Sequence, residues 1–234
     1  MFVVIGTRSL MLVLVLAGFL AASTTSPLDS ARDQQDRATL EKLANEYSAA
    51  AAKSPNDADA QYRAALASSY LAEVALEVRD KKQAEQVAER GVKLAERAVE
   101  LKPDVGEYYR VLGTLCGQVV PANVLSGLSY GKRAQEAIGK ALEKDPKSPA
   151  VYVARGVGNY YLPAALGGGI DLAIADFRKA IQLDAKNAEA YLWLGLSLRK
   201  QSKNSEAREA FSKSLELDPN RIWAKQQLDK TPAK

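Results

Sequence analysis

Histidine is absent from the 234 residues, and cysteine occurs once, as Cys116. Without histidine, the chain has no histidine-based zinc site and no Ser-His or Cys-His nucleophile. The lone thiol forms no internal disulfide, and its apolar neighbours in VLGTLCGQVV favour burial over reactivity. Paired carboxylates could still act in catalysis, but the acidic residues fall mostly at positions predicted to face solvent, where a solvated face is the default interpretation. We therefore expect a non-enzyme with no metal site and no cofactor.

A strong net charge is also missing. Lysine and arginine number 32 against 28 acidic residues, which gives a formal charge of +4 with no basic block. This balance argues against a nucleic-acid partner. Hydrophobic residues make up 47% and charged residues 26% of the chain, values typical of a globular domain.

The N-terminus has the order of a secretory signal. MFVVIGTRSLMLVLVLAGFLAA carries one charge, Arg8, then an apolar run over residues 10–20, then small residues. The run is shorter than the about 20 residues that span a bilayer. We expect an exported protein, periplasmic or secreted, with residues 1–22 as signal peptide and 23–29 as linker. The alternative is an uncleaved segment that anchors the chain to a membrane.

Four segments of the remaining chain end in similar short sequences, and a fifth, less similar one precedes them. Tyr109, Tyr152 and Tyr191 each lie six residues beyond a closing position, and each is followed four residues later by glycine. Such self-similarity is the signature of a repeat architecture. The closing segments are AVELKPD, ALEKDPK, AIQLDAK and SLELDPN, after the weaker AAAAKSPND.

The last unit is the most regular. Small residues, Gly195 and Ala207, stand where two antiparallel helices must approach closely, while Tyr191 and Phe211 fill the layer between them. These positions resemble the 34-residue tetratricopeptide repeat. The resemblance implies an all-α fold, an α-solenoid of antiparallel helix pairs. We expect about four units with N- and C-terminal capping helices over residues 30–229, followed by a disordered tail at 230–234.

The repeat spacing shrinks along the chain. Closing positions 55, 103, 146, 185 and 219 are separated by 48, 43, 39 and 34 residues. The residues by which the first interval exceeds a regular 34-residue repeat include no proline. They predict two lengthened helices that turn near Asp80. The next two excesses, CGQVVPANVLSGLSYGKRAQ and NYYLPAALGGGIDLA, mix proline, glycine and apolar residues. They predict inserted loops on one edge of the stack, with Asp171 as an N-cap after the second.

The concave face of such a solenoid is its usual binding surface. It would bind a protein or peptide partner, and we predict this scaffold role. The alternative is a small anionic or apolar ligand, held in a cleft between the two loops. Projecting the repeat onto first-helix positions gives an aromatic and basic set of candidates: Arg63, Tyr70, Arg110, Gln118, Tyr160, Tyr161, Arg199 and Lys200.

The layout also resembles one group of exported bacterial repeat proteins, the T-component proteins associated with tripartite (TRAP) transporters. The shared features are a long first helical pair, a proline-glycine loop in a later unit, here PAALGGGID, and a regular final unit. The resemblance implies a periplasmic helical protein with a ligand-accessible cleft that hands a ligand to a partner.

Overall fold

The computed structural model describes residues 26–121 and 124–233, which form eleven α-helices, one 3-10 turn and no strand. The predicted signal peptide lies outside the described residues. Residues 27–29, assigned to the linker from the sequence, form the first turn of a helix. The helices are α1 Pro27–Asp33, α2 Arg37–Lys53, α3 Ala58–Glu77, α4 Lys81–Leu101, α5 Gly106–Val119, α6 Val124–Lys144, α7 Pro149–Tyr161, α8 Ile170–Leu183, α9 Ala188–Lys200, α10 Asn204–Leu217 and α11 Ile222–Asp229.

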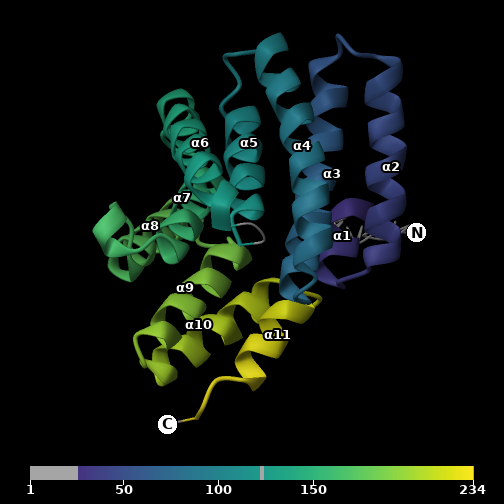
Figure 1. The fold of residues 1–234 in the computed structure, drawn as a ribbon. Helices are drawn as coiled ribbons and strands as arrows, with labels where there is room; N and C mark the ends of the chain where they lie inside the picture. Colours follow the sequence, from purple (N-terminus) through teal and green to yellow (C-terminus); the bar gives the residue numbers. More distant parts are fainter. Residues whose placement is uncertain (1–25, 122–123, 234) are drawn as a thin grey trace, which may run out of the picture.

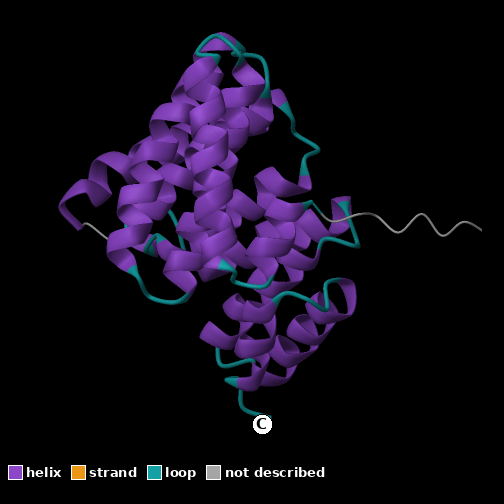
Figure 2. Ribbon diagram, turned by 90° about the vertical axis from the view of Figure 1, so that its right-hand side faces the viewer, coloured by secondary structure: helices purple, strands orange, loops and turns teal. Residues whose placement is uncertain are grey.

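The helices form the expected solenoid. Four antiparallel pairs, α3/α4, α5/α6, α7/α8 and α9/α10, follow one another, and each pair packs on the next. The helices α1 and α2 cover the first pair, while α11 covers the last (Figure 1). The chain turns as it stacks, so that α9–α11 lie beneath the lower ends of α3 and α4 (Figure 1). Figure 2 shows the helices joined by short loops.

Side-chain caps explain where several helices begin. The carboxylates of Asp36, Asp57 and Asp80 accept backbone N–H groups in the first turns of α2, α3 and α4, as N-caps do. Arg79 ends the preceding helix in a left-handed conformation with φ 66. The predicted turn near Asp80 between two long helices is therefore confirmed.

The glycines of the repeat stand where helices cross. A Cβ on Gly156 would lie 2.5 Å from the ring of Phe177, and one on Gly195 would lie 2.6 Å from the ring of Phe211. Only glycine permits these aromatic rings to pack directly on the opposing backbone. The small-residue positions read from the last unit are confirmed in the unit before it as well.

The loop predicted in the second unit is wrong. The helix α5 continues to Val119 and α6 starts at Val124, so most of the glycine-containing stretch is helical. Each glycine costs a helix only about 1 kcal/mol, and tertiary contacts outweigh this cost. Tyr130 packs on the core of the first two units, and Arg133 forms an ion pair with Glu96 of α4.

The loop predicted in the third unit is confirmed. The helix α7 ends at Tyr161, and a 3-10 turn over Ala164–Leu166 leads into three glycines. Gly167 and Gly169 have φ 87 and 122, which favour glycine, and a Cβ on Gly168 would lie 2.4 Å from the Leu162 carbonyl oxygen.

The N-cap of α8 is Gly169, not Asp171 as predicted. The carboxylate of Asp171 lies inside the first turn and accepts a hydrogen bond from Gln201 Nε2 at 2.6 Å. The sequence could not show this contact, because Gln201 belongs to the following unit.

Two hydrophobic cores fill the solenoid. The first spans α1–α5, and the second spans α7–α11. A small cluster of Tyr109, Ile138, Ala141 and Val151 joins them where α5, α6 and α7 meet. Cys116 is buried in the first core, as predicted.

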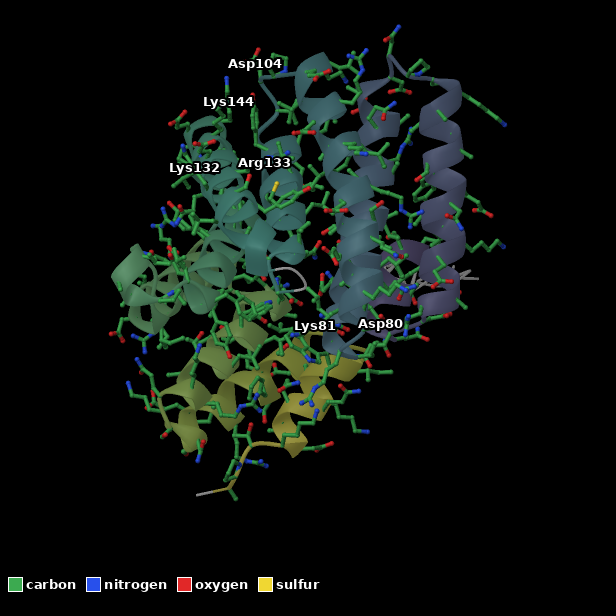
Figure 3. The ribbon with its side chains drawn as sticks, viewed as in Figure 1. Asp80, Lys81, Asp104, Lys132, Arg133 and Lys144 are labelled. Atoms are coloured by element: carbon green, nitrogen blue, oxygen red, sulfur yellow. The ribbon has the colours of Figure 1, made fainter. Side chains whose placement is uncertain are left out.

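Exposed ion pairs connect neighbouring elements on the surface (Figure 3). At one end, Lys144 Nζ lies 2.7 Å from the carboxylate of Asp104, so the end of α6 is held to the loop before α5. At the opposite end, Arg37 pairs with Asp80 at 2.9 Å. None of the described helices is long and apolar enough to cross a membrane.

Candidate functional site: the concave channel and its aromatic edge

The first helices of the four units, α3, α5, α7 and α9, pack on one another in order and form the face named the concave channel, and α1 packs on α3. Tyr70 donates its hydroxyl hydrogen to Asp29 Oδ1 of α1 at 3.0 Å. The guanidinium of Arg32 lies 4.8 Å from the centre of the Tyr70 ring, in cation–π geometry. Leu28 is buried in the first core. The part of the concave face around Tyr70 is thus filled by the chain itself.

A buried cluster of charges closes the channel further along. Arg221, at the start of α11, has 1% of its surface exposed. Its guanidinium lies 2.6 Å from Glu73 and 2.5 Å from Glu77, both on α3. It also reaches Glu189 of α9 at 3.5 Å and Asp33 of α1 at 3.9 Å. This group, named the Arg221 cluster, links the last unit to the first across 144 residues of sequence.

Acids outnumber bases in the Arg221 cluster. Four carboxylates share two guanidinium groups, those of Arg221 and Arg32. Burial, together with the neighbouring Glu189 and Glu77, raises the pKa of Glu73 to about 7, although the positive charge of Arg221 lowers it. Burial lowers the pKa of Arg221, but the surrounding carboxylates outweigh it and hold the pKa above its usual value. The cluster therefore keeps its cations, and burial raises the pKa of Asp33, Glu73 and Glu77. Burial also acts on Glu189, but the nearby Arg221 and Arg32 outweigh it and lower the pKa of that carboxyl.

Two of the predicted site residues are structural. Gln118 is buried and exchanges hydrogen bonds with Ser69, donating to its carbonyl oxygen at 3.0 Å, so it joins α5 to α3. Arg199 donates to the side-chain oxygen of Gln227 at 2.7 Å and to Thr231 at 3.2 Å, so it holds α11 in place. Both side chains are used within the fold, and their part in a binding surface stays a prediction.

Two other predicted residues have different surroundings. Arg110 forms a bidentate pair with Glu107 at 2.5 and 2.6 Å on the channel side of α5. Tyr62 donates to the same carboxylate at 3.0 Å. Arg63 is exposed on α3 and forms no hydrogen bond or ion pair among the described residues. The geometry does not bring Arg63 together with the others.

The remaining three predicted residues do come together. The rings of Tyr160 and Tyr161 lie 5.0 Å apart, and both meet Trp193 of α9 edge to face at 5.6 and 6.1 Å. Lys200 lies 4.4 Å above the Tyr160 ring and donates to the Tyr160 carbonyl oxygen at 3.2 Å. The ring of Trp223 on α11 packs edge to face on Trp193, with the ring centres 5.3 Å apart.

Three large apolar side chains in this stretch of the sequence are exposed. Tyr161 is 60% exposed, Leu166 in the loop is 61% exposed, and Leu172 on α8 is 49% exposed. These three residues are named the aromatic edge. Soluble proteins rarely leave several large apolar side chains exposed in one short stretch without a use for them. The exposed loop could be read from the sequence, whereas the supporting rings of Trp193 and Trp223 come from the next unit.

The described residues hold no grouping suited to metal chemistry. Among residues 26–121 and 124–233, no three His, Cys, Asp or Glu side chains are arranged to hold a metal ion. Burial also raises the pKa of the Cys116 thiol to about 11, so a nucleophilic thiolate is disfavoured.

Comparison with solved structures shows the fold alone. A thermophilic TPR protein of Thermus thermophilus matches with a TM-score of 0.60 and 19% identity, over 86% of this chain and 97% of that one. A haemophore of Porphyromonas gingivalis matches with a TM-score of 0.53 and 20% identity, over 76% and 96% of the two chains.

Sequence comparisons find similar proteins or family models for both halves of the chain. The small glutamine-rich tetratricopeptide repeat-containing protein 2 of Mycosarcoma maydis is 36% identical over 96 residues, 41% of this chain and 26% of that protein. Two tetratricopeptide repeat models match residues 166–202 and 188–221. A model described as regulator of microtubule dynamics protein 1-3 matches residues 26–162. The resemblance to T-component proteins stays a prediction. The chain is thus a tetratricopeptide repeat protein that belongs to the regulator of microtubule dynamics protein 1-3 family.

Proposed function

We propose that this chain is an exported, non-enzymatic scaffold that binds a protein or peptide partner at the aromatic edge. Tetratricopeptide repeat proteins generally act as protein-interaction scaffolds. The observation that carries the proposal is the exposure of Tyr161, Leu166 and Leu172 beside rings held rigidly by Trp193. The concave channel suits a partner less well, because α1 and the Arg221 cluster fill it.

The chemistry of the aromatic edge indicates the kind of segment it would bind. Tyrosine and tryptophan are enriched among the residues that dominate binding energy, since they bury a large area at little cost in conformational entropy. Lys200 adds a positive charge beside the rings. A partner segment with two or three apolar side chains and one carboxylate would match this surface.

A photo-crosslinking experiment tests the site directly. A benzoylphenylalanine in place of Tyr161 should capture a discrete partner, whereas the same group in place of the exposed Arg63 should not. The Tyr161→Ala/Leu166→Ser double variant should lose the partner in pull-down while keeping its helix content. Equal capture at both positions, or full retention by the double variant, would place the binding surface elsewhere.

Export carries a separate test. The N-terminal sequence of residues 1–22 supports cleavage, so N-terminal sequencing of the mature protein should begin near Ser23. The family description names microtubule dynamics, and microtubules lie inside cells, where a cleaved and exported chain does not meet them. An intact N-terminus together with co-sedimentation with polymerised tubulin would replace the export proposal with a microtubule-binding one.

A small apolar ligand is the second candidate function, favoured by the exposed Leu166 and Leu172. Among the residues that the structure describes, the inserted loop is the one after Tyr161, so the ligand would lie against that loop and not between two. Native mass spectrometry of the chain purified from its own source would show a bound mass that is lost on denaturation. A bare chain in that measurement, with no thermal shift across organic acids and lipids, rules this candidate out.

A further inference from the structure

A second surface, away from the aromatic edge, lies between α2 and α4. Both helices pack mainly on α3, which lies between them in the view of Figure 1. Side chains of α4 bond to α2 at one end of this interface and to the loop after α2 at the other. The middle is left as a groove, and the residues that line it have not entered any function described above.

Polar bridges close both ends of the groove. Near the start of α4, Gln83 bonds to Glu41 and to Arg37 of α2, and Arg37 also pairs with Asp80. Further along α4, Arg97 donates to the side-chain oxygen of Asn56 at 2.7 Å and to the Pro55 carbonyl oxygen at 3.2 Å. From position 83 to position 97, α4 rises about 21 Å at about 1.5 Å per residue.

The space between the bridges is a cavity of about 310 Å³. Its deep part is formed by small and apolar side chains that are buried, Ala44 of α2, Ser68 of α3 and Val87 of α4. Leu94 forms a half-buried wall. The volume is at the lower end of the range for ligand sites, about 300–1,000 Å³.

The rim of the cavity carries two positive charges. Arg90 and Lys93 line it, both are exposed, and neither forms an ion pair or hydrogen bond among the described residues. The acid nearest in sequence is Glu89. The pKa of Tyr130 is raised first by burial and second by Glu89, so Glu89 lies on the α6 side of α4. The α2 side offers Asn45 and Ser48 at the rim, which are neutral hydrogen-bonding groups. The groove thus combines an apolar floor with cations that are free to pair.

We propose that this groove binds an acidic peptide segment in which carboxylates alternate with apolar side chains. Extended chain advances about 3.3 Å per residue, so roughly six residues fit between the two polar bridges. Every second side chain would face the floor at Val87 and Leu94, while the carboxylates between them meet Arg90 and Lys93. Two unpaired cations favour an anionic partner and disfavour a basic one.

The test uses the full chain and two fluorescent hexapeptides. One alternates leucine and glutamate, and the other has glutamine in place of each glutamate. Fluorescence anisotropy at about 0.15 M salt, where distant charges are screened, measures both affinities. The Arg90→Glu/Lys93→Glu variant removes the cations. The Ser48→Trp variant fills the groove at constant charge, and Asn45→Trp repeats this at a more exposed position. The Lys186→Glu/Lys225→Glu variant, with the same net charge change at exposed lysines of the last units, is the matched control.

The proposal expects the glutamate peptide to bind and the glutamine peptide to bind at least about tenfold more weakly, as for loss of a charge-assisted hydrogen bond. Charge reversal and both tryptophan variants should each weaken binding by a similar factor, and the matched control should not. No binding of the glutamate peptide overturns the proposal. The proposal is also overturned if charge reversal abolishes binding of the glutamate peptide while the tryptophan variants still bind it. That result would mean that the charges attract the peptide without its lying in the groove. Tyr161→Ala/Leu166→Ser should bind the peptide normally, so the aromatic edge is tested independently.

Discussion

The two halves of this solenoid are packed in different ways. In the first half, α3 and α4 are 20 and 21 residues long and meet through alanines such as Ala65, Ala72 and Ala88. In the second half, α9 and α10 are 13 and 14 residues long and meet where the ring of Phe211 packs on Gly195. Long helices with small side chains and short helices with large ones are thus two ways to build the same helical pair.

The difference matters because little connects the halves. A cluster around Tyr109, Ile138 and Val151 joins the two cores on one side, and the Arg221 cluster joins them on the other. The last unit therefore depends on charges contributed by α3 for its position. This arrangement predicts that single changes affect the halves unequally.

The largest effect is expected from Arg221→Ala. It leaves Glu73, Glu77 and Glu189 without their shared cation, and removing one partner of a buried ion pair costs about 3–5 kcal/mol. Chemical denaturation should show this loss, together with earlier unfolding of α9–α11. The exposed Arg178→Ala is the matched control and should leave the free energy of unfolding unchanged. Equal stability of the two variants would mean that the cluster does not hold the halves together.

The packing contrast itself is tested by one truncation in each half. Phe211→Ala removes a fully buried ring and should cost about 3–5 kcal/mol. Ala72→Gly, also fully buried, removes one methyl group from a helix interior and should cost about 1–2 kcal/mol. Denaturant titration of both variants gives the ratio, and a larger loss for Ala72→Gly would contradict the comparison.

Two glycines of the third unit should respond with opposite signs. Gly168→Ala places a Cβ 2.4 Å from the Leu162 carbonyl oxygen, so the loop must shift at a cost of about 1–3 kcal/mol. Gly158→Ala lies in α7 with no atom within 4 Å, so it should stabilise the helix by up to about 1 kcal/mol. Thermal unfolding checks both, and a loss of stability in Gly158→Ala would show that α7 has an unrecognised neighbour.

A further expected effect concerns pH. The pKa of Glu73 is raised to about 7 by burial, so the folded protein binds a proton there more tightly than the unfolded chain. This contribution to stability is present below the unfolded pKa of about 4.5 and is lost as pH rises through about 7. The stability of the wild type relative to Glu73→Gln should therefore increase as pH falls from about 8 to about 5. A flat difference over that range would contradict the raised pKa.

The sequence predicted the features that arise from local patterns. Periodicity, turn chemistry and apolar neighbours predicted the four units, the turn near Asp80, the glycine loop after Tyr161 and the buried Cys116. The stretch after Cys116 was wrongly predicted as a loop, because its glycines are tolerated in a helix that contacts two neighbours through Tyr130 and Arg133.

The contents of the concave channel could not be predicted. Asp29 meets Tyr70 because α1 packs on α3. Arg221 meets Glu77, 144 residues away, because the solenoid turns back toward its own start. No local pattern encodes that curvature. For the same reason, Gln118 and Arg199 looked available for a partner but are used within the fold.

Hydrogen exchange of the full chain tests the central claim most directly, namely that the chain fills its own channel and so leaves partners the aromatic edge. An isolated seven-residue helix such as α1 would exchange freely, because helices this short are marginal in water. The account predicts that the amides of α1 are protected together with those of α11, and that Arg221→Ala removes both protections while α4 keeps its own. Rapid exchange of α1 in the wild-type protein would contradict the account and reopen the concave channel as the binding surface.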